Sequence, residues 1–255
     1  MGKTLGLIAL SVFLFPAEAP AQGTAAQNQE TSEAQFVALQ ADLFDEQRLM
    51  AFPQAVSDIA RMLRDIRSQF PVAANMRIPV QWTANTSLIV GFQRTFQPQV
   101  DRLCVGWSGY ARIRSETIGI PAMDAITRQF GGEYEITCQN RGASLGPYVV
   151  ASFPRLLHVP SLARRYRAAM GVTSAENNHL VLGGVTPVAV KKEGAQWRVT
   201  LGRGSGDCPA GCIFREYHHF LVASDFTIQS LGTEQQGEAP IPEPPEDPPE
   251  EVIPQ

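Results

Sequence analysis

Residues 109–137 read GYARIRSETIGIPAMDAITRQFGGEYEIT and predict a strand, a helix and a second strand. Pro121 suits the start of the helix, because the N–H that proline lacks has no partner in a first turn. Gly131-Gly132 suits its end, since glycine adopts the left-handed conformation that terminates helices. The apolar residues between them recur at helical spacing: Ala122, Ala125, Ile126 and Phe130.

Residues 147–178, PYVVASFPRLLHVPSLARRYRAAMGVTSAENN, follow the same plan, with Pro160 at the start of the helix and Gly171 at its end. The apolar stripe consists of Leu162, Tyr166, Ala169 and Met170. Together the two segments give β-α-β-β-α-β, the pattern of a ferredoxin-like sandwich with two helices on one face of an antiparallel sheet. We therefore predict an α+β fold with a ferredoxin-like core over residues 106–184. The two segments match in the order of their elements and not in residue identity, so the question whether one arose by duplication of the other is left open.

The flanking regions predict a helix on the N-terminal side and strands on the C-terminal side. Residues 52–70 carry one apolar stripe at spacings of three and four, which indicates an amphipathic helix packed on a core. Strand-like runs follow at 80–92 and 102–114, so residues 36–105 are expected to contain an N-terminal helix and strands. Residues 185–233 predict a C-terminal antiparallel β extension.

The N-terminus is typical of a cleaved export signal, residues 1–21, in which Lys3 precedes an apolar run and small residues follow. That run is about half the roughly 20 apolar residues that cross a bilayer as a helix. We expect cleavage after Ala21, a secreted or periplasmic protein and no transmembrane segment in the mature chain. The preference for Arg over Lys favours a bacterial source. The polar residues 22–35 and the acidic, proline-rich residues 234–255 are expected to be disordered, because they bury too little apolar surface.

The charge distribution gives little support for binding to nucleic acid. The net charge is -4, but residues 34–233 carry 20 Lys and Arg against 15 Asp and Glu. This basic excess is dispersed, with one cluster at Arg164, Arg165 and Arg167, whereas nucleic-acid-binding domains gather basic residues into a patch.

Four cysteines in an exported chain favour structural disulfides, because an even number can pair completely in an oxidising compartment. They are Cys104, Cys138, Cys208 and Cys212, and three pairings are open. We favour Cys208–Cys212, which brackets a turn-forming Pro-Ala-Gly, together with Cys104–Cys138. The C-x-x-x-C spacing differs from thioredoxin-like centres, which use two intervening residues and a helix N-terminus.

A metal site is the chemical alternative for GDCPAGCIFREYHHF, residues 206–220, since zinc accepts two thiolates with two imidazoles. Its candidate ligands are Cys208, Cys212, His218 and His219. Adjacent residues of a strand point to opposite faces, so we expect His218 in the core and His219 on the surface, and we predict no metal. Serine hydrolysis has candidate histidines, such as His158 and His179, but no G-x-S-x-G elbow. We predict no catalytic residue and no cofactor.

Two resemblances bear on function. GDCPAGCIFREYHHFLV, residues 206–222, resembles the C-terminal motif of functionally uncharacterised exported bacterial proteins, in which a D-C-P-x-G-C turn precedes an aromatic-rich strand. LARRYRAAMGVTSAENN, residues 162–178, resembles the helix-to-strand portion of subtilisin-propeptide-type protease inhibitors. That second resemblance implies a ferredoxin-like module that binds a protease through its sheet and an extended segment. This chain departs from the pattern by continuing well past the point where a propeptide ends.

These observations favour a non-catalytic protein-binding module, with a protease as one candidate partner. The alternative is a thiol-redox or metal-binding protein centred on Cys208, Cys212 and a histidine. A structural component of the cell envelope is a third hypothesis. The ligand and the oligomeric state stay open.

Overall fold

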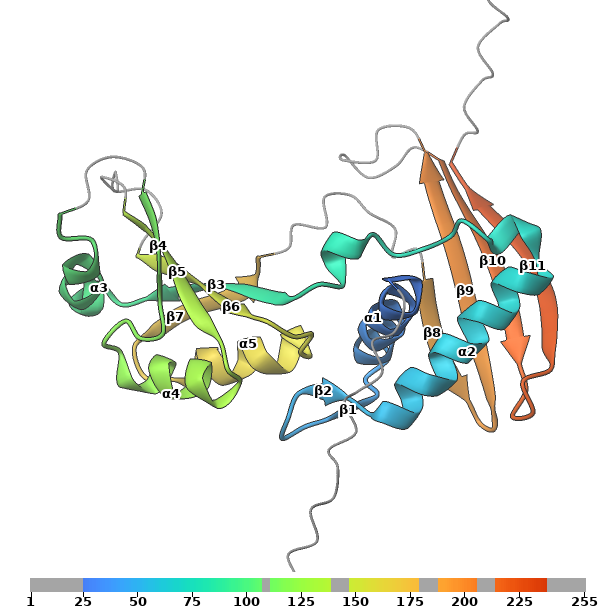
Figure 1. Ribbon diagram of the computed structural model, residues 1–255, viewed down its shortest axis with the longest axis horizontal. Coiled ribbons are helices and arrows are strands. Elements are labelled where there is room, and N and C mark those ends of the chain that lie inside the picture. The colour runs from blue at the N-terminus through green and yellow to red at the C-terminus, as the bar shows by residue number, and fades with distance from the viewer. Residues whose placement is uncertain (1–24, 107–110, 139–146, 179–187, 206–213, 238–255) are drawn as a thin grey trace, which may run out of the picture.

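The computed structural model describes residues 25–106, 111–138, 147–178, 188–205 and 214–237. In this part of the chain, helices pack on two larger antiparallel sheets, one of five strands and one of four (Figure 1). Between them lies a small hairpin of β1 (Phe44–Asp45) and β2 (Met50–Ala51). Each larger sheet has its own buried apolar core. The predicted α+β class is therefore confirmed.

Helix α1 (Ala25–Gln40) occupies most of the N-terminal stretch that the sequence predicts to be disordered. Its residues Ala34 and Val37 are buried in a core shared with α2 (Pro53–Gln69). The prediction of disorder for residues 22–35 is therefore wrong over the helical part. This stretch is too polar to fold alone, but its small apolar residues let α1 lie close to α2, which supplies the remaining apolar surface.

Helix α2 confirms the amphipathic helix predicted for residues 52–70. Ile59, Leu63 and Ile66 lie on its buried side at the predicted spacing. The 3-10 turns η1 (Pro71–Ala73) and η2 (Val80–Trp82) follow it and lead into the five-stranded sheet. Helices α1 and α2 lie together on one face of the four-stranded sheet (Figure 1).

The four-stranded sheet is a meander with the spatial order β11-β10-β9-β8. Its strands are β8 (Val188–Glu193), β9 (Gln196–Ser205), β10 (Phe214–Val222) and β11 (Ile228–Gln236). Val199 and Phe220 point from it into the core under α1 and α2. Strand β11 extends beyond residue 233, and Glu234 pairs with Tyr217 of β10. The disorder predicted from residue 234 onward is therefore wrong for residues 234–236, because their backbone groups complete the sheet.

The five-stranded sheet is antiparallel throughout, with the order β4-β5-β6-β3-β7. Its strands are β3 (Thr86–Phe92), β4 (Ala111–Ser115), β5 (Glu133–Cys138), β6 (Tyr148–Phe153) and β7 (Val172–Asn177). Helices α4 (Pro121–Gln129) and α5 (Val159–Ala168) cover one face (Figure 1). Both helices begin with a proline in the first turn, and Gly131 and Gly171 follow them with positive φ angles of 67° and 88°. The predicted punctuation of these helices by proline and glycine is confirmed.

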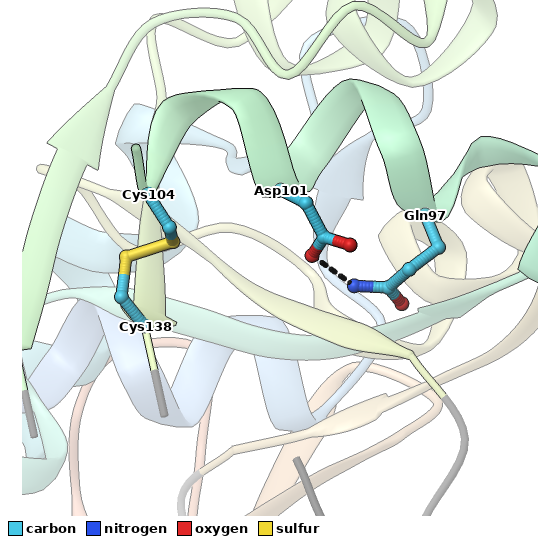
Figure 2. The surroundings of a disulfide bond; sticks show 4 residues. All are labelled: Gln97, Asp101, Cys104 and Cys138. Atoms are coloured by element: carbon cyan, nitrogen blue, oxygen red, sulfur yellow. Dashed lines mark hydrogen bonds between the residues drawn. A yellow bond between two sulfur atoms is a disulfide. The ribbon is translucent and has the colours of Figure 1, made fainter. Parts of the chain in front are cut away.

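A short helix replaces part of a predicted strand. The sequence predicts a strand over residues 102–114, but α3 (Gln97–Leu103), which follows η3 (Arg94–Phe96), extends into this range, and β4 begins at Ala111. Pro98 stands in the first turn of α3, where proline favours a helix. One turn along, Gln97 Nε2 donates a hydrogen bond of 2.5 Å to Asp101 Oδ1 (Figure 2).

Candidate functional site

Within the described part of the chain, helices cover one face of the five-stranded sheet and leave the other face uncovered. On the helix side, alternate residues of the strands are buried in the core. On the opposite side, which we call the open face, most side chains are half-buried or exposed. The principal side chains of the open face are Ser87, Ile89, Arg112, Arg114, Glu133, Glu135, Tyr148, Val150 and Ser152.

Two cross-strand ion pairs line one side of the open face. Arg112 Nη1 lies 3.3 Å from Glu135 Oε1, and Arg114 Nη1 lies 2.9 Å from Glu133 Oε1. The arginine side chains are 61 % and 72 % exposed. Exposed pairs of this kind contribute little to stability. Their charged groups are therefore available to rearrange around a bound partner at small cost to the fold.

Two adjoining hollows, of about 960 and 550 Å³, lie on the open face. They share Arg112, Glu135, Val150 and Asn178, so they form one continuous surface. The larger hollow has small polar groups beside the ion pairs, including Ser87, whose Oγ accepts a hydrogen bond of 2.9 Å from Asn178 Nδ2. The smaller hollow adds the apolar and aromatic side chains Ile89, Pro147 and Tyr148.

Several polar groups of the open face already have partners within the described part of the chain. The described residues that line its two hollows include no histidine and no cysteine. Glu133 and Glu135 are each engaged by an arginine. A serine nucleophile needs a base within hydrogen-bond reach, whereas Ser87 is bonded to the amide of Asn178. The surface instead combines apolar contact area with charged groups of both signs.

Cys104 and Cys138 form a disulfide with a Cα–Cα distance of 5.4 Å (Figure 2). The bond joins the residue after α3 to the last residue of β5. Both cysteines pack with the core on the helix side of the sheet and line neither hollow. The bond therefore fixes α3 to the sheet. Cys208 and Cys212, and the pairing predicted for them, lie outside the described residues, as does His179.

His218 and His219 point to opposite faces of the four-stranded sheet. His218 is buried, with Nδ1 3.1 Å from Thr233 Oγ1 and Nε2 3.2 Å from Glu216 Oε1. His219 is half-buried on the outer face, with Nδ1 3.1 Å from Thr200 Oγ1. Among the residues that the structure describes, no three His, Cys, Asp or Glu side chains are grouped to hold a metal ion. The structure does not bring the two histidines to one site.

His158 connects polar groups in an order that resembles a catalytic triad. Its Nδ1 lies 2.9 Å from Ser161 Oγ, and its Nε2 lies 3.2 Å from Asp42 Oδ1. Ser161 is only 2 % exposed, and its Oγ also accepts a hydrogen bond of 2.6 Å from Arg164 Nη2. An enclosed hydroxyl that already accepts a charged donor cannot reach a substrate. These residues therefore hold the start of α5 against the segment that carries Asp42.

The sequence predictions named no residue of the open face as part of a site, although a signal for it is present. In ARIRS (111–115) and EYEIT (133–137), charged residues alternate with Ile or Tyr. A period of two indicates a strand with one face toward solvent. Arginine on one strand and glutamate on the other also suggest cross-strand pairing. This combination indicates a charged sheet face, but not the hollows beside it.

The chain matches no protein-family model, no curated protein and no solved structure. None of the helices in the described part is long and apolar enough to span a membrane.

Proposed function

We propose that this chain is an exported, non-catalytic binding protein that receives an extended segment of a partner protein on the open face. The observation that carries the proposal is the half-covered sheet, whose open face combines Ile89, Val150 and Tyr148 with two exposed Arg–Glu pairs. An extended segment alternates its side chains between two sides. Side chains on one side of the bound segment would contact Ile89, Val150 and Tyr148. Charged side chains of the segment would pair with the arginines or glutamates of the open face in place of the present Arg–Glu pairs.

The strand order supports a ferredoxin-like description of this unit. The elements would be β3, α4, β5, β6, α5 and β7, because the observed order β7-β3-β6-β5 has the first and third of these strands at the centre. Strand β4 would then be an added edge strand beside β5. On this description the unit begins at residue 86, before the range 106–184 that the sequence predicts.

The resemblance of residues 162–178 to subtilisin-propeptide-type inhibitors makes a protease the first partner to consider. These residues include most of α5 and all of β7, and Tyr166 is fully buried in the core. Strand β7 is an edge strand that pairs only with β3 among the described strands. The edge of β7 that no other described strand pairs, together with the open face beside it, would be the surface through which such an inhibitor acts.

A titration with a subtilisin-type serine protease, inactivated at its nucleophile so that it cannot cleave the chain, tests this partner. We expect micromolar or tighter binding to the wild type and a loss of about tenfold or more for Val150→Arg, which places a long charged side chain at the centre of the open face. Leu221→Arg is the matched control, because Leu221 is also half-buried on a central strand, in the other sheet. Absence of binding, or equal weakening by both substitutions, would contradict the protease proposal.

The alternative function, thiol-redox or metal chemistry at Cys208, Cys212 and a histidine, makes a different prediction. His218 could ligate a metal only by giving up its contact with Thr233 at Nδ1 or with Glu216 at Nε2. Cys208→Ser would remove bound metal or redox activity on the alternative. If the binding proposal is correct, Cys208→Ser leaves partner binding unchanged and lowers only the free energy of unfolding. Metal analysis of the native protein and thermal unfolding of the variant distinguish the two.

A further inference from the structure

The β1–β2 hairpin belongs to both cores at once. It connects α1 to α2, which lie on the four-stranded sheet, and Leu43 and Ala51 at its base contact that core. Further along the hairpin, Leu49 is fully buried in the other core, and Phe44 and Met50 pack against it. The hairpin therefore packs against both sheets, whose apolar cores are otherwise separate.

His158 lies at the point where the hairpin is attached to α5. Its backbone N–H donates a hydrogen bond of 2.8 Å to Leu49 O. Its ring stacks on Phe44, with ring centroids 3.9 Å apart, and its Nε2 lies 3.2 Å from Asp42. About two turns along the helix, Arg165 Nη2 donates to Glu46 O at 2.5 Å. His158 thus contacts the hairpin through its backbone N–H and the face of its ring, and the residue just before the hairpin through the edge of its ring.

The hydrogen bonds around the ring fit the neutral tautomer that carries its proton on Nε2. Arg164 can only donate, so Ser161 Oγ accepts from it at 2.6 Å. The hydroxyl proton of Ser161 is then free to point at His158 Nδ1, 2.9 Å away, which accepts it. In this arrangement the ring proton sits on Nε2 and points toward Asp42 Oδ1. A second ring proton on Nδ1 would require the Ser161 hydroxyl to turn its proton away and to accept from both Nδ1 and Arg164.

We propose that the hairpin is an acid-released clasp: when His158 takes up a second ring proton, the hairpin detaches from α5 and the two sheets become free to move relative to each other. The charge would sit on a ring that is 8 % exposed and stacked on Phe44. Leaving the interface lets the imidazolium reach water, which solvates it better than this partly apolar site does. The bond between His158 N–H and Leu49 O would be lost in the same step.

The charges that face His158 set the pH at which this release occurs. Burial is the largest effect and lowers the pKa of His158; Arg164 lowers it further, whereas Asp42 and Glu46 raise it. The two carboxylates are 80 % and 70 % exposed, so water screens them. Because the pKa is lower in the closed state than in the released state, the clasp is stable above the ordinary histidine pKa. It weakens as the pH falls below that value.

Hydrogen exchange of the full mature protein at about pH 7.5 and about pH 5, on either side of the ordinary histidine pKa of about 6.5, tests the proposal. After correction for intrinsic exchange rates, we expect the amides of Leu49 and His158 to lose protection by about tenfold or more at the lower pH. Amides of β6 and β9, at the centres of the two sheets, should keep theirs. Unchanged protection at Leu49 and His158, or equal loss in the sheets, would overturn the proposal.

Two variants separate the clasp from general acid sensitivity. His158→Gln keeps an acceptor and a donor but cannot be charged, so hairpin protection should become independent of pH; His219→Gln, in the other sheet, should respond as the wild type does. Asp42→Asn is a second variant that retains the exposed Oδ1 acceptor at a position with φ of 57°, which asparagine tolerates. It removes a charge that raises the pKa of His158 in the closed state, so the difference between the closed-state and released-state pKa widens and release should occur at higher pH than in the wild type. Acid release that persists in His158→Gln, or a midpoint that Asp42→Asn moves to lower pH, would rule the clasp out.

Discussion

A buried ion pair between Glu33 and Arg67 holds α1 against α2. Arg67 Nη1 and Nη2 donate to the two carboxylate oxygens of Glu33 at 2.8 and 2.7 Å, and the side chains are 6 % and 2 % exposed. Arg67 Nη2 also donates to Met76 O at 2.6 Å, and Glu33 Oε1 accepts from Ile78 N at 2.9 Å. The pair therefore fixes the chain after α2 as well as the two helices.

Glu33→Ala should lower the free energy of unfolding by about 3–5 kcal/mol, because it leaves the Arg67 charge buried without its partner. Glu30→Ala is the matched control on the same helix. Glu30 pairs with Arg64 at 3.2 Å, but that arginine side chain is 58 % exposed, so the loss should be at most about 1 kcal/mol. Urea unfolding of both variants measures the difference, and similar losses would mean that the buried pair has no special role.

The turn from α5 into β7 depends on glycine. Gly171 has a φ of 88°, and a Cβ added there would overlap the ring of Phe96, which precedes α3. Gly194, in the turn between β8 and β9, has a φ of 64° with nothing within 4 Å of an added Cβ. The two glycines share the left-handed conformation and differ in the space around them.

Gly171→Ala should therefore destabilise the protein more than Gly194→Ala. The left-handed conformation costs a non-glycine residue about 1–2 kcal/mol, and this should be nearly the whole effect at Gly194. Overlap with Phe96 adds about 1–3 kcal/mol at Gly171. Thermal unfolding of the two variants gives the comparison, and an equal loss would show that the ring of Phe96 moves aside freely.

Features set by short stretches of sequence could be predicted, whereas features set by distant contacts could not. The stripe of α2 and the proline and glycine around α4 and α5 are local signals, and these helices form where predicted. The composition of α1 is too polar to predict a helix from the sequence. The helix is stabilised by distant contacts instead, namely its packing on α2 and the pairing of Glu33 with Arg67. The position of β3 between β6 and β7 depends on pairing across long loops, which no local pattern specifies.

The sequence did not predict the open face as a site, because this surface also depends on contacts between distant segments. The open face draws on five strands, and its hollows exist only once these strands lie side by side. Conversely, the histidines that the sequence brings together, His218 and His219, are separated by the sheet. The attachment of Asp42 to His158 likewise joins two distant segments.

The most direct test of binding at the open face is a selection of displayed random peptides on the mature wild-type protein, followed by affinity measurements on Val150→Arg and Leu221→Arg. The account predicts that the enriched peptides share an apolar or aromatic residue next to charged ones. They should bind Val150→Arg about tenfold or more weakly, and Leu221→Arg as the wild type. Absence of enriched peptides, or peptides that bind Val150→Arg as tightly as the wild type, would contradict the account.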